Sequence, residues 1–170
     1  MDPLQIQIID ILNPDNPSVL DGVVSLITLL GEWKFLALVG AGVFFKEREL
    51  GKALFVALAL TAVLVYPLKI LINEQRPWVE HAEIRAIGNE DPNSSFPSGH
   101  AAFSFSYFMV IYKKRRTGIL LAAAILVAST RLYLGQHYPL DVAVGALIGI
   151  TTGFFAARFF IVNVEADSNV

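Results

Sequence analysis

From Leu50 to Ile72 the chain reads LGKALFVALALTAVLVYPLKILI, an apolar run of 23 residues whose only charged residues are Lys52 and Lys69. A helix needs roughly 20 residues to cross the core of a bilayer, so this run predicts a transmembrane helix. Of all 170 residues 55% are hydrophobic, and the mean hydropathy is +0.57. This composition is too apolar for a soluble domain of the same length, and it predicts an integral membrane protein.

Other apolar stretches extend this prediction to the rest of the chain. The expected fold class is all-α, an integral membrane bundle of about six transmembrane helices in a single domain over residues 1–170. The expected helices are 18–30, 33–46, 50–74, 98–113, 117–134 and 138–162. The first two are short for complete crossings, so the sequence leaves open whether 18–46 is two short helices or one long helix.

The N-terminal segment Met1 to Asn16 contains Asp2, Asp10 and Asp15 and no lysine or arginine. It therefore lacks the basic region of a cleaved signal peptide, and we expect it to be retained. Its apolar residues fall mostly on one helical face, which predicts a short interfacial helix before Pro14.

The charged residues predict an orientation in the membrane. The polar stretch Asn73–Pro97 cannot lie in hydrocarbon and must be an exposed loop. Two basic segments, Lys46–Lys52 and Lys113–Arg116, fall on the opposite face if the helices alternate in direction. Because basic loops favour the cytoplasm, we expect that face and both termini to be cytoplasmic, with the long loop on the extracytoplasmic side of the cell membrane.

Composition also excludes several functions. The net charge of −2 gives no basic surface for nucleic acid. The chain has no cysteine, so disulfides, thiolate metal sites and a cysteine nucleophile are excluded. The composition makes the bilayer an expected partner and nucleic acid an unexpected one, and it names no oligomeric state.

The last predicted helix carries Gly145, Gly149 and Gly153 at four-residue spacing. Small residues at this spacing let a second helix approach closely. We attribute them to packing and give them no chemical role.

Six ionisable residues fall near helix ends on the side of the long loop. They are Lys69, Arg76, His100, Arg131, His137 and Asp141. Polar side chains at membrane depth usually face a shared polar cavity, and three cations with two histidines predict an anion site there. Each residue also has an ordinary explanation: Lys69 and Arg76, for example, could be interfacial anchors of a purely structural bundle, and replacing them with glutamine would then alter only orientation.

Lys69 and Arg76 lie on one helix face if the helix continues to Arg76, where Pro77 would end it. The segment Pro97-Ser98-Gly99-His100 could be an ordinary helix start capped by Ser98. As a functional segment, it would offer backbone N–H groups and a helix dipole to phosphate, with His100 beside the anion as a proton donor.

His137 and Asp141 are one helical turn apart, a spacing that allows a hydrogen bond from the imidazole to the carboxylate. Such a bond fixes the tautomer and leaves the other ring nitrogen unprotonated, which makes His137 a plausible nucleophile. A structural histidine remains the alternative for this residue taken alone.

Together these segments resemble the three-part signature of the type 2 phosphatidic-acid-phosphatase family, in the wider vanadium-haloperoxidase-like superfamily. The matching residues are Lys69-x6-Arg76-Pro77, Pro97-Ser98-Gly99-His100 and Arg131-x5-His137-x3-Asp141. One residue departs from the family pattern, since Thr130 stands where the family usually has serine. Thr130 keeps a hydroxyl that could bind phosphate.

The resemblance implies a lipid phosphatase that works through a phosphohistidine. His137 would attack phosphorus, Asp141 would hold its ring, and His100 would protonate the leaving oxygen. Phosphate would be bound by Lys69, Arg76, Arg131 and the backbone N–H groups of Ser98 and Gly99, with no metal and no cofactor. The motifs contain one carboxylate, which is too few for a dedicated Mg²⁺ site.

The resemblance leaves the lipid open. Polyprenyl diphosphate, such as undecaprenyl diphosphate, is the preferred substrate, with phosphatidylglycerol phosphate, phosphatidate and diacylglycerol pyrophosphate as alternatives. The competing function is a non-catalytic carrier or flippase of anionic lipids, which would keep working without its histidines.

Overall fold

The computed structural model describes residues 3–88, 93–115 and 118–162, and all the regular elements over these residues are helical. This confirms the all-α fold class. The helices are α1 (Pro3–Leu12), α2 (Val19–Thr28), α3 (Trp33–Lys46), α4 (Arg48–Ile72), α5 (Pro77–Glu80), α6 (Gly99–Arg115), α7 (Ile119–Tyr133) and α8 (Pro139–Ala157). A 3₁₀ turn, η1 (Leu29–Gly31), joins α2 to α3, and a π turn, η2 (Arg158–Val162), extends α8.

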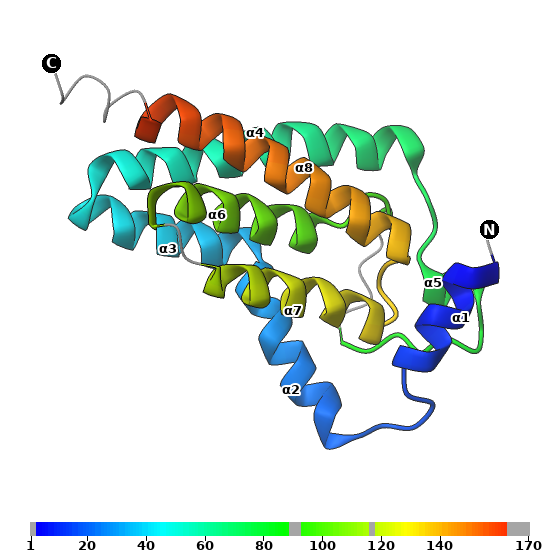
Figure 1. Ribbon diagram of the computed structural model, residues 1–170. Helices are drawn as coiled ribbons and strands as arrows, with labels where there is room; N and C mark the ends of the chain where they lie inside the picture. Colours follow the sequence, from blue (N-terminus) through cyan, green and yellow to red (C-terminus); the bar gives the residue numbers. More distant parts are fainter. Residues whose placement is uncertain (1–2, 89–92, 116–117, 163–170) are drawn as a thin grey trace, which may run out of the picture.

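Helix α6 is the central element of the bundle. Figure 1 shows α3, α4, α7 and α8 lying alongside it, with α2 leaving the bundle at an angle. All the side chains from Ala101 to Phe108 are buried, including the polar Ser104 and Ser106. The surrounding helices therefore shield a comparatively polar helix from the environment.

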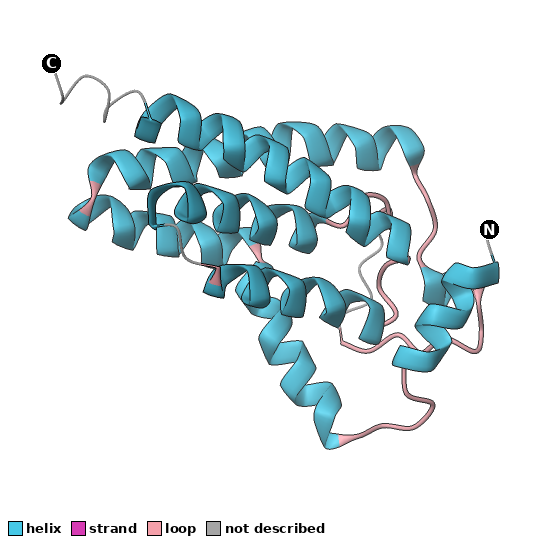
Figure 2. Cartoon of the chain, in the orientation of Figure 1, coloured by secondary structure: helices cyan, strands magenta, loops and turns pink. Residues whose placement is uncertain are grey.

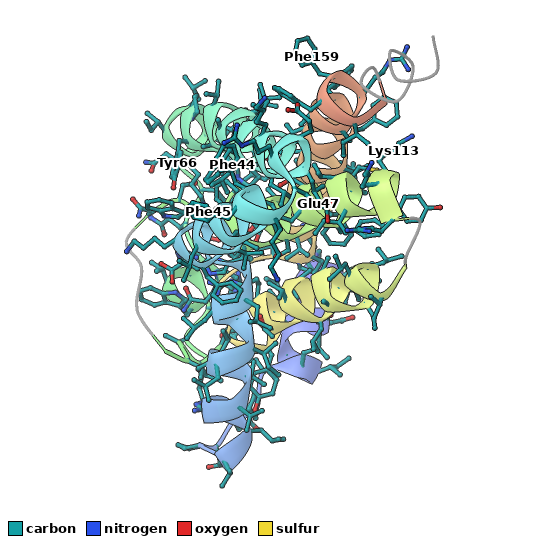
Figure 3. The ribbon with its side chains drawn as sticks, turned by 90° about the vertical axis from the view of Figure 1, so that its left-hand side faces the viewer. Phe44, Phe45, Glu47, Tyr66, Lys113 and Phe159 are labelled. Atoms are coloured by element: carbon teal, nitrogen blue, oxygen red, sulfur yellow. The ribbon has the colours of Figure 1, made fainter. Side chains whose placement is uncertain are left out.

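The outer surface of the bundle and two of its helices are suited to a membrane. Arg48–Glu80, which includes α4, and Pro139–Ile161, which includes α8, are long and apolar enough to cross one, and the pair α2 and α3, bent by 53° at their junction, would make a third span if counted as one. Large apolar side chains such as Phe45 and Phe159 project outward (Figure 3). The chain is thus a membrane protein, but the expected six crossings exceed the two or three that helix length supports over the described residues.

The two ends of the bundle differ in character. One, the loop end, carries the connection from α4 through α5 to α6, as the pink segments of Figure 2 show. There Asp21 at the start of α2 binds Arg85 at 2.8 Å and accepts a hydrogen bond from the Tyr133 hydroxyl at 2.9 Å. The other, the basic end, carries the α3–α4 junction, where Glu47 pairs with Arg115 at the end of α6.

The direction of the helices differs from the expected one. Because α2 begins at the loop end and α3 finishes at the basic end, the bent pair makes a single pass along the bundle. Helix α1 also lies at the loop end, where Asn13 after it donates to the Tyr133 carbonyl at 2.7 Å. The expectation that the N-terminus lies at the end opposite the long loop does not match this arrangement.

Helices α6 and α8 touch through their backbones. A Cβ atom placed on Gly145, Gly149 or Gly153 would lie 2.1–2.4 Å from a carbonyl oxygen of α6 or of the residue before it. The packing role predicted for these glycines is therefore confirmed, and the contact fixes the start of α6 against the start of α8.

We expect Gly149→Ala to lower the free energy of unfolding by about 1–3 kcal/mol, because the added methyl group would force two packed helices apart. In the structure that methyl group would lie 2.1 Å from the Ala102 carbonyl oxygen. Thermal unfolding in detergent measures the effect. Gly42→Ala is the matched control, since a Cβ there meets nothing within 4 Å, and equal melting temperatures for the two variants would contradict the expectation.

Candidate active site

Arg76 reaches the site from a loop. Helix α4 ends at Ile72, because Asn73 turns into the left-handed region at φ 47°. The predicted helix 50–74 thus ends two residues early and does not reach Arg76, which instead adopts an extended conformation just before Pro77 and α5. Its side chain is 3% exposed, and its guanidinium donates to the carbonyl oxygens of Gln136 at 2.8 Å and Asn93 at 2.9 Å.

Lys69, in the last turn of α4, points toward the segment that precedes α6. Its Nζ donates to the Ser94 carbonyl oxygen at 2.5 Å and lies 3.4 Å from the Ser95 carbonyl oxygen. The lysine is therefore held at the mouth of α6, where its positive charge adds to the positive end of the helix dipole.

The start of α6 differs in one respect from the expected phosphate cradle. The Ser98 N–H donates to the Asp141 carbonyl oxygen at 3.0 Å, so this group is already engaged. Helix α6 begins at Gly99, and a Cβ on Gly99 would meet only the Phe103 and Val65 side chains, at 3.7 and 3.9 Å. Both distances are ordinary van der Waals contacts, so packing among the described residues does not require glycine at this position.

His137 is delivered by the tight turn between α7 and α8. Gly135 has φ +67°, and a Cβ there would lie 2.4 Å from the Arg85 carbonyl oxygen, so glycine is required on both counts. One turn earlier on α7, Arg131 donates to the Thr28 hydroxyl at 2.8 Å. Thr130 turns away, because its hydroxyl donates to the Val127 carbonyl oxygen at 2.6 Å.

The expected direct bond between His137 and Asp141 is not formed. His137 Nδ1 lies 3.6 Å from Asp141 Oδ2, which is too long for a hydrogen bond. That oxygen already accepts hydrogen bonds from the Ser95 hydroxyl at 2.5 Å and from the Tyr138 N–H at 2.8 Å. These two donors occupy the carboxylate oxygen that faces the imidazole.

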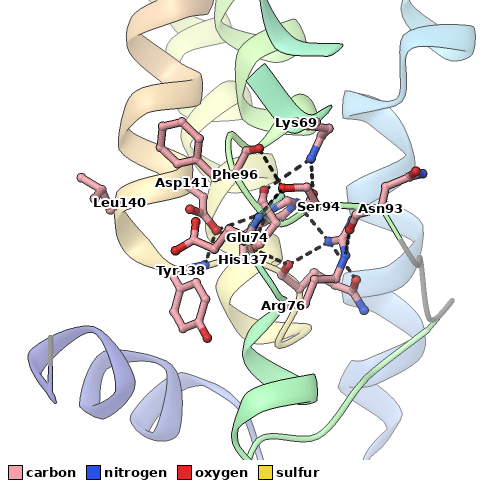
Figure 4. Close-up of polar contacts among 12 residues, drawn as sticks. Lys69, Glu74, Arg76, Asn93, Ser94, Phe96, His137, Tyr138, Leu140 and Asp141 are labelled. Carbon is pink, nitrogen blue, oxygen red and sulfur yellow. Dashed lines mark hydrogen bonds and ion pairs between the residues drawn. The ribbon is translucent and has the colours of Figure 1, made fainter. Parts of the chain in front are cut away.

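These side chains surround one cavity of about 700 Å³. Figure 4 shows Lys69, Arg76 and His137 converging there, with Asp141 behind the imidazole. Six of the eight predicted site residues line the cavity, namely Lys69, Arg76, Gly99, His100, Arg131 and His137. Ser98 and Asp141 lie behind this lining and are 0% and 1% exposed.

The electrostatics of the cavity favour an anion beside a neutral imidazole. Burial, and then the positive charges of Arg131, Arg76 and Lys69, hold the pKa of His137 well below its usual range. The ring is therefore uncharged at neutral pH and carries a proton on one of its two nitrogens. Its Nδ1 faces Ser95 and Asp141, whereas Nε2 lies 3.4 Å from the Arg76 guanidinium, so Nε2 is the nitrogen directed toward the cations.

Sequence reasoning missed several residues that hold this arrangement. Gln136 directly precedes His137, and Ser95 is separated from Pro97 by one residue. Closeness to the motifs was therefore the signal that could have identified both. Thr28 has no such signal, because it comes from the bent helix pair far away in the chain. Within the described residues, no group of three or more histidine or acidic side chains is placed to hold a metal ion.

Comparison with known proteins identifies the family. Residues 50–165 match the model of the PAP2 superfamily. The chain belongs to this superfamily, whose members include the type 2 phosphatidic-acid phosphatases predicted from the motifs.

Several relatives share most of the chain. It is 38% identical over 128 residues to the decaprenylphosphoryl-5-phosphoribose phosphatase of Mycobacterium tuberculosis, with 71% of this chain and 67% of the relative covered. It is 32% identical to the bacitracin transport permease protein BcrC of Bacillus licheniformis, with 71% of this chain but only 63% of that protein covered. Among solved structures, Aquifex aeolicus LpxE superposes with a TM-score of 0.85 at 31% identity, covering 92% of this chain and 96% of that one.

A second solved structure, a phosphatidylglycerolphosphate phosphatase of the PAP2 type from Bacillus subtilis, has a TM-score of 0.73 at 26% identity. The match covers 92% of this chain and 84% of that chain. The whole described bundle therefore has the architecture of PAP2-type proteins.

We expect Arg131→Gln to weaken the binding of inorganic phosphate about 10-fold to 100-fold, because it removes a charge-assisted donor from the cavity. Titration calorimetry of the folded protein in detergent measures the affinity. Arg158→Gln is the control, since Arg158 lies in η2, beyond the end of α8. Equal phosphate affinity in the two variants would show that the cavity is not the anion site.

Proposed function

We propose that the protein is a membrane phosphatase that hydrolyses a lipid phosphate or lipid diphosphate through a phosphohistidine, with polyprenyl diphosphate as the preferred substrate. The observation that carries the proposal is a neutral, buried imidazole whose Nε2 shares a cavity with three cations. Phosphoryl transfer depends mainly on positioning and on stabilising the charge of the equatorial oxygens, and this arrangement supplies both.

In the first step His137 Nε2 attacks phosphorus, and the bond from phosphorus to the leaving oxygen breaks. With the negatively charged phosphate bound beside it, His100 is in its imidazolium form, and it gives its proton to that oxygen and becomes neutral. Lys69, Arg76 and Arg131 bind the equatorial oxygens, together with the free N–H groups at the start of α6. The phosphate is then covalently bound to His137.

In the second step water attacks the phosphohistidine, and the bond between phosphorus and Nε2 breaks. His100, now neutral, takes a proton from the water, which restores both histidines. The cations stay in place in both steps, so we propose that the reaction needs no metal ion.

An apolar groove beside the cavity supports a lipid substrate. The groove, of about 280 Å³, lies between α3, α4 and α6, and shares Trp33, Tyr66 and Phe103 with the phosphate cavity. A phosphate headgroup in the cavity could therefore extend its chain along the groove. The names of the relatives, which include undecaprenyl-diphosphatases of Bacillus subtilis and Sulfolobus acidocaldarius, favour a polyprenyl chain.

The charge distribution supports an extracytoplasmic site. Lys46, Arg48 and the Lys113–Arg115 segment lie at the basic end, opposite the cavity. Because basic segments favour the cytoplasm, we propose that the basic end is cytoplasmic and the cavity opens on the outer face of the cell membrane. With the bent pair as one pass, the chain would cross five times, and α1 would lie on the outer side with the site.

We expect His137→Ala to abolish phosphate release, because no other residue is proposed to form the covalent intermediate. The assay measures inorganic phosphate from undecaprenyl diphosphate, phosphatidylglycerol phosphate and phosphatidate in detergent. Acid-labile, alkali-stable phosphoprotein should appear in the wild type and be missing from the variant.

The same assay with a chelator tests the metal-free mechanism, and we expect unchanged turnover. His81→Ala is the matched control for His137→Ala, since His81 makes an edge-to-face contact with Tyr138 at the loop end and is not among the residues that line the cavity. Full phosphate release by His137→Ala would refute the phosphohistidine at His137, whereas a folded wild type that releases no phosphate would refute the enzyme and leave the lipid carrier.

We expect Ala59→Trp to lower the ratio of kcat/KM for undecaprenyl diphosphate to that for a short-chain phosphate ester by about tenfold, because the indole would fill the groove that receives the chain. Ala123→Trp is the control, since Ala123 is also exposed but lines a different apolar groove beside α7. If both variants change the ratio equally, the hydrocarbon chain of the lipid does not occupy the groove between α3, α4 and α6.

A further inference from the structure

Ser95 lies between His137 and Asp141, the two residues whose side chains the sequence predicts to bond directly. It belongs to the segment before α6, is 0% exposed, and its own N–H donates to the Glu74 carbonyl oxygen at 2.8 Å. The backbone of this serine is thus tied to the α4–α5 loop, so its side chain is held from a third element, separate from α7 and α8.

The Ser95 hydroxyl has one short contact and two longer contacts. It donates to Asp141 Oδ2 at 2.5 Å, and it lies 3.4 Å from both His137 Nδ1 and the Gln136 carbonyl oxygen. A hydroxyl can donate one hydrogen bond while accepting another. Since its proton goes to the carboxylate, its lone pairs are available to the N–H of the imidazole.

The alternative route from the imidazole to the carboxylate is longer. His137 Nδ1 and Asp141 Oδ2 are 3.6 Å apart, while the Tyr138 N–H shares the same oxygen at 2.8 Å. Oδ1, the other oxygen of Asp141, is buried without a hydrogen-bond partner among the described residues. The hydrogen bonds from Ser95 and Tyr138 therefore both end on Oδ2, and a side-chain hydrogen bond with Glu74 also acts on this carboxyl group. Of the Ser95 and Tyr138 donors, Ser95 is the one whose side chain also lies beside the imidazole.

We infer that Ser95 is a positioning residue whose hydroxyl carries the hydrogen-bond link from His137 Nδ1–H to Asp141, keeping Nε2 unprotonated and directed at phosphorus. The inference rests on the proposed phosphohistidine function. It assigns to the serine the orienting role that spacing alone gave to Asp141.

The surroundings explain why such a link is needed. Lys69, Arg76 and Arg131 face the imidazole from α4, the α4–α5 loop and α7, while His100 faces it from α6. Glu74 lies near Asp141 on the opposite side. Cations on one side of the ring and carboxylates on the other favour the proton on Nδ1, but only a hydrogen-bonded partner fixes the ring angle.

Kinetics of three variants give the first test. We expect Ser95→Ala to lower kcat about 10-fold to 100-fold with KM within about twofold, because a bond to the nucleophile is lost while the phosphate ligands stay. Ser95→Cys keeps the volume but has a weak donor, and should resemble Ser95→Ala. Ser95→Thr keeps the hydroxyl and should recover part of kcat, whereas Ser106→Ala removes another buried hydroxyl, on α6, and should keep full activity.

A double-mutant cycle with Asp141→Asn separates positioning from general stability. If Ser95 acts through Asp141, adding Ser95→Ala to Asp141→Asn should cost less than about twofold in kcat. Independent losses that multiply would overturn the inference, as would a Ser95→Ala enzyme with wild-type kcat.

Nitrogen NMR of the ring gives a test that does not depend on turnover. The chain has three histidines, so ¹⁵N-histidine labelling, with His81→Gln and His100→Gln for assignment, isolates the signals of His137. We expect the Nδ1–H tautomer in the wild type and mixed tautomers in Ser95→Ala and Ser95→Cys. If the wild type is inactive but the tautomer still changes in the Ser95 variants, the phosphatase function is refuted and the positioning role of Ser95 stands. If the wild type is active and the tautomer does not change in the Ser95 variants, only the positioning role is refuted.

Discussion

The site depends on the direct contact between the backbones of α6 and α8. Gly145 faces the Ser98 carbonyl oxygen so closely that a Cβ there would lie at 2.4 Å, and the Ser98 N–H in turn donates to the Asp141 carbonyl oxygen at 3.0 Å. The start of the helix that carries His100 is therefore bonded to the start of the helix that carries Asp141. Bulkier residues would separate these helix ends and with them the residues of the two helices that form the site.

Three buried or half-buried cations, Lys69, Arg76 and Arg131, lie at one level of this membrane protein. Their positive charges must be stabilised, and backbone carbonyl oxygens supply part of that stabilisation. Arg76 and Lys69 each donate to carbonyl oxygens of neighbouring loops, and Arg131 donates to a neutral hydroxyl. The positive charges of these three residues also act on His137, where together with burial they hold the imidazole in its neutral form.

The sequence predicted which residues line the cavity better than it predicted how they reach it. Residue type and motif spacing identify Lys69, His100, Arg131 and His137, because phosphate chemistry limits which side chains can serve. Spacing failed for Arg76, since the left-handed turn at Asn73 ends α4 and the arginine reaches the cavity from a loop. It failed again for the link to Asp141, because helical periodicity gives the distance between two residues of one segment and cannot reveal Ser95 arriving from another.

The bend within residues 18–46 separates two helices that are each short for a complete crossing of the bilayer. This bend also contributes residues to the site. Gly31 packs so tightly against α6 and α7 that a Cβ would lie 2.4 Å from a Val127 methyl carbon and 2.8 Å from the Ser104 hydroxyl. The chain bends by 53° around this contact, which brings Gly31, Glu32 and Trp33 to the wall of the cavity. Trp33 then borders both the cavity and the apolar groove. A straight helix of the same length could cross the membrane. It would not bring Glu32 to the cavity and Trp33 to the border between the cavity and the apolar groove within three residues.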